Sequence, residues 1–446
     1  MTHPVIELGD ARPPLLGSSL NDLLRRWLPG QRWYAGSGRP ISEISVAAAT
    51  ALTPECFHLL MRVKEAGEQE ESHYQLILGA AVDPPPRLWR HALGQVDGPT
   101  GGTLMVYDAV HDHRVAILLL DRLREGGKVG ALRFESFPRA SVPTGLAPRV
   151  LDAEQSNTSI VYGDRLILKL FRRIQQGINP DLEVTARLGR SGHTSVPAPT
   201  AWFFVTEPFW GTLGMVQPFL TDATDGWQLA LRSASTQGDF IKQARGLGRM
   251  TGELHAALAH VFPTGTAEGH HRSRLAEEMT HRLRHSAEAV PALRRHVPAL
   301  EGIFADVATS TSEPPLQRIH GDLHLGQVLW RNGSWHVVDF EGEPARPLAE
   351  RRADRSPIRD VVGMLRSFDY AAHMGPTPRP RWAEQCRSAF CSGYSEAGGF
   401  EPADAPELLR AYEADRAVYE VLYEATHRPD WITVPLKAVA RLAGSL

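Results

Sequence analysis

Hydrophobic residues in the first third of the chain occur in short runs separated by Gly, Pro and Asp. Runs of this kind are typical of strands in a mostly antiparallel sheet. They predict strands at residues 44–49, 56–63, 74–78, 104–107, 115–120 and 132–137. Ahead of them, apolar residues at helical spacing predict a helix over residues 18–27, which Pro29 and Gly30 end.

Two apolar runs in the middle of the chain, 159–162 and 166–171, flank a Gly-Asp-Arg connection and predict a β-hairpin. The polar segment just before it, Glu154–Ser159, could offer backbone N–H groups and side chains to phosphate oxygens, although an ordinary polar turn has the same composition. The candidate phosphate contacts are Gln155, Ser156, Asn157 and Thr158. After the hairpin, Asn179 and Pro180 begin a predicted helix that carries Glu183.

Two further apolar runs, 201–205 and 214–219, complete a small predicted sheet, and helical periodicity prevails after residue 220. Gln217 and Phe219 are therefore expected at a hinge between two lobes, where backbone groups would meet an adenine ring. In the helical part, the glycines of residues 247–255 allow close packing. His255 is expected to be a packed or capping histidine, because no second ligand is near it in sequence.

A chain of 446 residues exceeds the usual limit for one hydrophobic core, so two or three domains are expected. Prolines and a glycine between residues 139 and 148 mark the first boundary, and the change to helical periodicity marks the second. The predicted domains are residues 1–145, 146–220 and 221–446. Within the first, Gln31–Gly36 places two aromatic residues and a cation among glycines, which suits either a packed turn or a contact with a neighbouring domain.

The composition narrows the possible functions. Hydrophobic residues make up 42% of the chain and charged residues 22%, as in ordinary folded proteins. The 48 basic and 51 acidic residues give a net charge of −3, so neither nucleic acid nor an anionic membrane is an expected partner, and a small-molecule substrate is favoured. Three cysteines without metal-ligand spacing fit a reducing compartment. Residues 1–14 lack the apolar core of a signal peptide, so we expect a cytoplasmic protein.

One stretch carries the chemistry: His320–Gln327, with the sequence HGDLHLGQ, followed by Asp339. Phosphoryl transfer needs a positioned hydroxyl, a metal that bridges phosphates, and cations against the developing charge. Asp322 would accept the proton of the hydroxyl, and Gln327 and Asp339 would hold Mg²⁺ through oxygen atoms. His320 is expected to brace the loop rather than to transfer a proton.

The nucleotide side of such a site has candidates earlier in the chain. Lys169 lies on a predicted strand and Glu183 on the helix after it. A lysine and a glutamate placed in this way fix the lysine against the α- and β-phosphates in kinase folds. An HGD triplet alone is weak evidence for a kinase. The order of Lys169, Glu183 and the expected metal ligands along the chain favours a kinase more strongly.

These segments resemble the maltokinase family of actinobacterial sugar kinases, within the superfamily of aminoglycoside phosphotransferases and eukaryotic-type protein kinases. The resemblance covers residues 31–36, 154–159, 166–173, 179–183, 320–327, 339–344, 356–372 and 412–435. It implies an α+β, bilobal, protein-kinase-like fold with an N-terminal cap subdomain, a β-rich intermediate subdomain and a helical C-lobe. It also implies that Asp322 is the catalytic base and that Gln327 and Asp339 bind Mg²⁺. The phosphate loop lacks glycines and Gln327 replaces the usual asparagine, but maltokinases are similar at both places, so an active enzyme is expected.

The acceptor is less well defined by the resemblance. Maltokinases typically carry a lysine where this chain has Arg416, and the two side chains are not interchangeable in a polar site. Glu420 and Glu424 lie on one helical face and would bind sugar hydroxyls or an ammonium group, unless the face is simply solvated. His324, Arg416, Glu420 and Glu424 are the expected substrate-binding residues.

With this altered helix the chain resembles the actinobacterial glucosamine kinases, which phosphorylate the 6-hydroxyl of an amino sugar. We therefore expect an ATP- and Mg²⁺-dependent kinase that makes glucosamine 6-phosphate and acts as a monomer or weak homodimer. The alternatives are a maltokinase that makes maltose 1-phosphate, an aminoglycoside phosphotransferase, and a nucleotide-binding pseudokinase.

Overall fold

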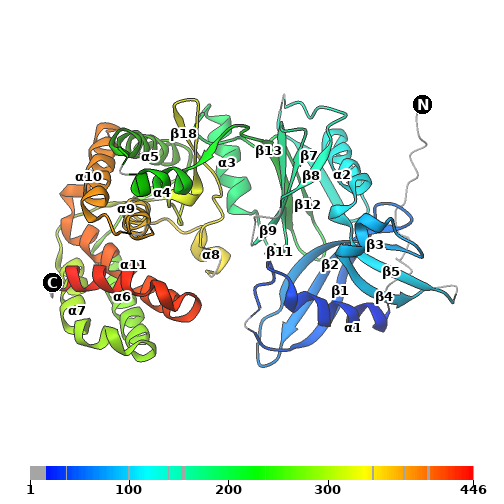
Figure 1. Ribbon diagram of the computed structural model, residues 1–446, viewed down its shortest axis with the longest axis horizontal. Helices are drawn as coiled ribbons and strands as arrows, with labels where there is room; N and C mark the ends of the chain where they lie inside the picture. Colours follow the sequence, from blue (N-terminus) through cyan, green and yellow to red (C-terminus); the bar gives the residue numbers. More distant parts are fainter. Residues whose placement is uncertain are drawn as a thin grey trace. The chain divides into compact units, whose positions relative to one another are not determined.

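The chain folds into two compact units, which are described separately (Figure 1). The computed structural model describes residues 17–444 except 37, 99–100, 139, 152–155, 237, 344–345, 375–376 and 399–401. The first unit contains the chain up to Ala186 together with Ala198–Thr221, and the second contains Arg187–Pro197 and the chain from Asp222 onward. Gln155, a predicted phosphate contact, lies outside the described residues.

An antiparallel sheet forms the N-terminal part of the first unit. Its strands follow the order β1-β2-β3-β5-β4, and β11 pairs with β3. The bounds are β1 Ile41–Ala51, β2 Cys56–Glu65, β3 Ser72–Ala81, β4 Ala92–Asp97, β5 Thr103–Asp108 and β11 Arg173–Ile174. Helix α1, Ser18–Trp27, occupies the predicted residues and buries Leu20, Leu23 and Leu24 in a cluster with apolar residues of this sheet.

A second sheet of the same unit follows the order β6-β7-β12-β13-β10-β9-β8. The bounds are β6 Gly127–Val129, β7 Leu132–Ser136, β8 Pro148–Val150, β9 Asn157–Tyr162, β10 Leu166–Phe171, β12 Ala201–Val205 and β13 Gly211–Pro218. The predicted hairpin is confirmed as β9 and β10, and Asn179 caps helix α3, Pro180–Arg190, by accepting from the Asp181 N–H at 2.8 Å. Since β6 and β7 precede residue 145, this sheet draws on both the first and the second predicted domain.

Residues 115–120, which the sequence predicts as a strand, belong instead to helix α2, His113–Glu125. Asp112 precedes the helix, and its carboxylate accepts from the Arg114 N–H at 3.1 Å. The helix buries Val115, Leu119 and Leu123 in the core that it shares with the second sheet. A short apolar run does not distinguish a strand from a buried helix, and the capping aspartate was the signal that decides between them.

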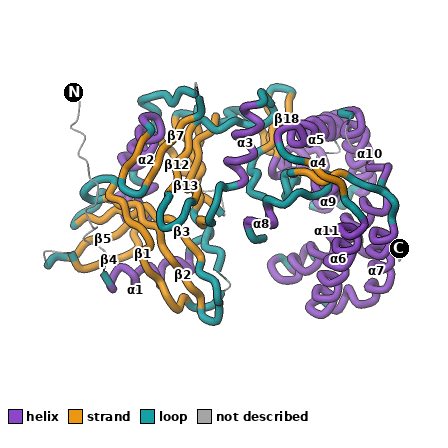
Figure 2. Tube along the Cα trace, turned by 180° about the vertical axis from the view of Figure 1, so that it is seen from behind, coloured by secondary structure: helices purple, strands orange, loops and turns teal. Residues whose placement is uncertain are grey.

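The second unit is mainly helical, as Figure 2 shows. Its helices are α4 Gly226–Thr236, α5 Ile241–Val261, α6 Gly269–Ala289, α7 Val297–Thr309, α8 Leu348–Arg351, α9 Ile358–His373, α10 Pro380–Glu396, α11 Pro406–His427 and α12 Thr433–Leu442. One core cluster joins apolar residues of α6, α7, α9, α11 and α12. The expected close packing is present, because a Cβ atom on Gly248 of α5 would collide with backbone of α10.

Two small sheets complete this unit. One contains β14 Thr224–Asp225, β17 Val328–Arg331 and β18 Ser334–Val337, and the other contains β15 Thr264–Thr266 and β16 Pro315–Gln317. The stretch His320–Gln327 lies between β16 and β17, and Asp339 follows β18. Within the described part of the chain, every helix is too short or too polar to cross a lipid bilayer.

Candidate active site

His320 fastens the loop between β16 and β17 to the segment that follows β18. The side chain is buried, its Nδ1 accepts from the Asp322 N–H at 3.3 Å, and its Nε2 lies 3.1 Å from the carbonyl oxygen of Val338, to which it donates in this tautomer. The ring also packs on Phe340 at a centroid distance of 4.7 Å. These contacts give His320 the bracing geometry expected from the sequence, next to both Asp322 and Asp339.

Asp360, near the start of α9, holds the backbone of the same loop. Its carboxylate accepts from the N–H groups of His320 and Gly321 at 2.8 and 2.9 Å, and it lies 3.2 Å from Nε2 of His255. Burial raises the pKa of Asp360, but these hydrogen bonds and the neighbouring histidines outweigh burial and hold the pKa below its usual range. The ionised carboxylate of Asp360 therefore holds the backbone of this loop in place. His255 also contacts the Tyr394 hydroxyl at 2.8 Å, which confirms it as a packed histidine.

Helix α9 can approach the loop this closely because residue 363 is glycine. A Cβ atom at Gly363 would collide with the carbonyl oxygen of Leu323. One turn further along, the Ser367 hydroxyl accepts from the Leu325 N–H at 3.3 Å. The loop that carries Asp322 thus rests on a rigid helix at several points along its backbone.

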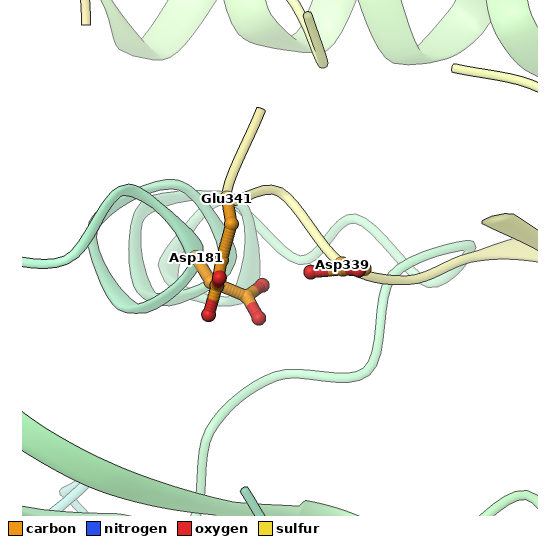
Figure 3. Close-up of side chains that lie close together, drawn as sticks. All are labelled: Asp181, Asp339 and Glu341. Atoms are coloured by element: carbon orange, nitrogen blue, oxygen red, sulfur yellow. The ribbon is translucent and has the colours of Figure 1, made fainter. Parts of the chain in front are cut away.

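Gln327 and Asp339 lie side by side, as a shared metal site requires. Nε2 of Gln327 donates to Oδ2 of Asp339 at 3.2 Å, and a half-turn of the amide would present its oxygen instead. Carboxylate oxygens of Asp339 and Glu341 lie within 4.8 Å of each other on the segment after β18 (Figure 3). Asp339 has a φ of +69°, a strained conformation of the kind found at functional sites. These hard oxygen donors fit Mg²⁺, and the sequence analysis missed Glu341.

Lys169 on β10 of the first unit forms an ion pair with Asp181. Its Nζ donates to Oδ2 of Asp181 at 2.8 Å, and the two side chains are 12% and 2% exposed. Asp181 lies in the first turn of α3, where Figure 3 also draws it. The sequence named Glu183 as the partner of Lys169 and missed Asp181. Glu183 is buried on the same helix, and its pairing with Lys169 stays a prediction.

The register of β9 against β10 separates the candidate phosphate contacts. Lys169 pairs with Ser159, and Phe171 pairs with Asn157, so Asn157 and Ser159 lie on the sheet face that carries Lys169. Thr158 pairs with Leu170 and lies on the opposite face, where its hydroxyl accepts from Nε of Arg172 at 2.8 Å. The Thr158 side chain is thus engaged away from Lys169, and its backbone remains the candidate. Ser156 is exposed just before β9.

Gln217 and Phe219 lie at the end of β13. Both are half-buried, and the boundary between the two units follows at Thr221. The N–H of Phe219 donates to the carbonyl oxygen of Arg165 at 2.9 Å, so this amide is used within the first unit. The expected contact with an adenine ring stays a prediction.

A cavity of about 730 Å³ opens beside Asp322 in the second unit. All four expected substrate-binding residues, His324, Arg416, Glu420 and Glu424, line it. Its other lining residues include Asp225, Glu343, Arg366, Tyr370, Tyr419, Tyr423, Arg428 and Trp431. Five carboxylates and three guanidinium groups are among the residues that line it.

The acidic face of α11 is ordered by ion pairs and is not a solvated helix face. Glu420 is 8% exposed and accepts from the buried Arg366 at 2.7 Å, while Glu424 is 1% exposed and accepts from Arg428 at 2.7 Å and from the Tyr370 hydroxyl at 3.1 Å. Arg416 links this face to the loop that carries Asp322, since its Nη2 lies 3.5 Å from Oδ1 of Asp322 and its Nε lies 3.6 Å from Oε1 of Glu420.

His324 and Glu343 complete the polar wall near Asp322. Nδ1 of His324 accepts from the Gly326 N–H at 3.0 Å, and its Nε2 lies 3.9 Å from Asp322. Burial lowers the pKa of His324, which favours the neutral ring. Burial raises the pKa of Glu343, but the guanidinium of Arg346, reinforced by other arginines, outweighs it and lowers the pKa, so this carboxylate is ionised.

Comparison with known proteins assigns the chain to a family. The phosphotransferase enzyme family matches residues 148–400, which is more than half of the chain. The chain belongs to this family. In this phosphotransferase, a maltokinase N-terminal cap domain also matches residues 27–112. The chain is therefore an enzyme, as the sequence predicted, and the expected relation to maltokinase-like proteins is confirmed.

Two relatives of this phosphotransferase are glucosamine kinases. The one from Streptacidiphilus jiangxiensis is 28% identical over 362 residues, covering 74% of this chain and 80% of the relative. The one from Mycolicibacterium smegmatis is 29% identical over 361 residues, covering 74% and 88%. These matches support the expected place among glucosamine-kinase-like proteins.

Solved structures confirm the predicted α+β, kinase-like fold of the phosphotransferase. A glucosamine kinase in complex with glucosamine, ADP and inorganic phosphate has a TM-score of 0.68 at 22% identity, with 99% of this chain and all of that chain covered. Another glucosamine kinase crystal form has a TM-score of 0.69 at 23% identity, with 98% and 99% covered. The fold is thus shared over nearly the whole length.

Proposed function

We propose that this phosphotransferase transfers the γ-phosphate of ATP, with Mg²⁺, to a hydroxyl of an amino sugar and converts glucosamine into glucosamine 6-phosphate. The observation that carries the proposal is the cavity beside Asp322, whose carboxylates outnumber its guanidinium groups. An ammonium-bearing sugar complements such a cavity, and the lining tyrosines and Trp431 give it apolar surface for the sugar ring. The similarity to glucosamine kinases supports the same substrate.

Asp322 is the proposed general base. Asp360 and His320 hold the loop backbone around it, so the carboxylate is pre-positioned to accept the proton of the acceptor hydroxyl. Gln327, Asp339 and Glu341 would hold Mg²⁺, which supplies charge stabilisation at the phosphate oxygens when bound. Lys169, with Asp181 beside it, would neutralise phosphate charge of the nucleotide, and Asn157 shares its sheet face.

The acceptor binds, in this proposal, between α9 and α11. Glu420 and Glu424 supply carboxylates to the ammonium group and hydroxyls of the sugar, and His324 supplies a neutral ring nitrogen at the mouth of the catalytic loop. Arg416 bridges Glu420 and Asp322, so it couples acceptor binding to the position of the base.

Maltose phosphorylation to maltose 1-phosphate is the second candidate. The match to a maltokinase N-terminal cap domain favours it, and a cavity of about 730 Å³ has room for a disaccharide. Tyr419, Tyr423 and His427 form a stacked row on α11, with centroid distances of 6.2 and 4.5 Å, that would suit a second sugar ring.

ADP release over a panel of glucosamine, glucose, maltose and an aminoglycoside tests the proposal. We expect turnover with glucosamine at a kcat/KM above those of glucose and maltose. A preference for maltose would replace the amino-sugar assignment with the second candidate. Absence of ADP release with every sugar in the panel would contradict sugar phosphorylation altogether.

A further inference from the structure

We propose that Arg172 is a positioning residue through which the N-terminal sheet fixes the phosphate-binding segment at the start of β9. The inference rests on the proposed use of ATP. It also gives a role to the aromatic segment Gln31–Gly36, because Trp33 of this segment contacts Arg172.

Arg172 is 1% exposed and joins three separate parts of the first unit. Its Nε donates to the hydroxyl of Thr158 at 2.8 Å, and its Nη2 donates to Oδ2 of Asp108, at the end of β5, at 2.8 Å. The guanidinium carbon lies 5.0 Å from the ring centre of Trp33. A strand of the N-terminal sheet, the aromatic segment and β9 therefore converge on one side chain.

Main-chain contacts hold Arg172 itself in place. The chain pairs with the second sheet through β10, up to Phe171, and with the N-terminal sheet through β11, from Arg173 onward. Arg172 is the residue at this corner, and its carbonyl oxygen accepts from the Gln75 N–H at 2.9 Å. The side-chain amide of Gln75 donates to the carbonyl oxygens of Phe171 and Leu213, which fastens the same corner to β13.

The contact acts on the nucleotide from the opposite face of the sheet. Thr158 points toward Arg172, whereas its neighbours Asn157 and Ser159 lie on the face of Lys169. The hydrogen bond from Arg172 to the Thr158 hydroxyl therefore fixes the position of the β9 backbone that carries Asn157. The segment Asn157–Ser159 is held next to Lys169 without any direct contact between Arg172 and the nucleotide.

Stability alone is a weak explanation for this arrangement. Burying a guanidinium is costly, and a buried ion pair often stabilises a fold no more than apolar residues of the same size. The Nη1 atom of Arg172 is buried and has no hydrogen-bond partner within the described part of the chain, which adds to that cost. A buried charge with directional contacts to Thr158 and Asp108 is better explained by the geometry that it imposes.

Thr158→Val tests the inference, because it removes the hydroxyl and keeps the shape. Loss of one hydrogen bond that positions the segment should raise the KM for ATP and the Kd for ADP about 3- to 10-fold. The Kd for adenosine, which has no phosphate, and the KM for glucosamine should change less than about 2-fold. Thr50→Val is the matched control: Thr50 is buried in the same unit and its hydroxyl accepts from the Ala131 N–H at 3.1 Å, without contact to Arg172.

Asp108→Asn supplies a second, independent variant at the other end of the contact. It should raise the KM for ATP and the Kd for ADP selectively, as Thr158→Val does. In the double variant, the fold-increase in these constants should be smaller than the product of the two single fold-increases, because both substitutions act through Arg172. Equal KM values for ATP in Thr158→Val and wild type, or equal losses for ADP and adenosine, would overturn the inference. If the wild-type protein binds neither ATP nor ADP, the proposed function fails instead.

Discussion

Asp360→Asn is the substitution that most directly separates the positioning of the catalytic loop from the chemistry of Asp322. The Asp360 carboxylate accepts from two loop N–H groups at 2.8 and 2.9 Å and contacts His255 at 3.2 Å. The side chain of asparagine keeps one oxygen that can accept a hydrogen bond, but its NH₂ group faces one of the groups that donate to the Asp360 carboxylate. At least one charge-assisted hydrogen bond is lost, and a buried N–H is left opposite another donor.

The size of the effect follows from these contacts. A hydrogen bond to a charged group contributes about 1.5–3 kcal/mol, and an unsatisfied buried donor costs about 1–3 kcal/mol more. If half of this cost appears as displacement of the loop, the barrier rises by about 1.5–3 kcal/mol and kcat falls about 10- to 100-fold. The KM for ATP should stay within about 2-fold, because Lys169 and β9 belong to the other unit.

The assay combines steady-state ADP release with urea unfolding, and Asp306→Asn, at an exposed position on α7, is the control. Because the pKa of Asp360 is held below its usual range, its contribution is complete above about pH 4 and is lost as pH falls through the lowered pKa. The drop in kcat should therefore be constant between about pH 6 and 9. A variant that loses stability but keeps wild-type kcat would refute the positioning role.

Three further substitutions test other parts of the structure. His58 is fully buried beside Gln75, and burial lowers its pKa to about 4, so the unfolding free energy of wild type should fall by about 2 kcal/mol between pH 7 and pH 5. His58→Gln should not show this fall, and equal losses for both proteins in urea titrations would contradict the reasoning. Arg416→Lys keeps a positive charge near Asp322 but removes the planar guanidinium that extends to Glu420, so kcat/KM for glucosamine should fall about 10-fold at nearly constant thermal stability. An unchanged kcat/KM would remove Arg416 from the acceptor site. Gly363→Ala pushes the catalytic loop away from α9, so kcat should fall about 10-fold or more while ADP binding persists, as nucleotide titration and ADP release can show.

The sequence was most informative where local pattern and chemistry coincide. The capped start of α3 and the β9–β10 hairpin are each encoded within a few residues, so their structures followed from capping and turn chemistry and from strand periodicity. Four residues were expected to bind the acceptor, Glu420 and Glu424 from helical spacing and Arg416 from the resemblance to maltokinases, together with His324 of the loop, and the structure places all four around one cavity.

The misses have two physical causes, which are contacts between residues distant in the chain and local patterns that fit more than one structure. Asp360 appears in the sequence only as an acid at the start of a helix, and its two loop N–H partners lie about forty positions earlier. Asp181 competes with Glu183 on the same turn of helix, and spacing alone cannot choose between them. The apolar run 115–120 was predicted to be a strand because all six side chains are apolar, including the exposed Ile117, so the run shows neither strand nor helix periodicity.

The central claim, that Asp322 is the base of an amino-sugar kinase, is tested most directly by single-turnover phosphate transfer from ATP to glucosamine in wild type and Asp322→Asn. The account predicts glucosamine 6-phosphate as the wild-type product, identified by phosphorus NMR. It also predicts a rate lowered about 10²- to 10⁴-fold in the variant, with ATP binding retained. A variant that transfers phosphate at close to the wild-type rate would contradict it.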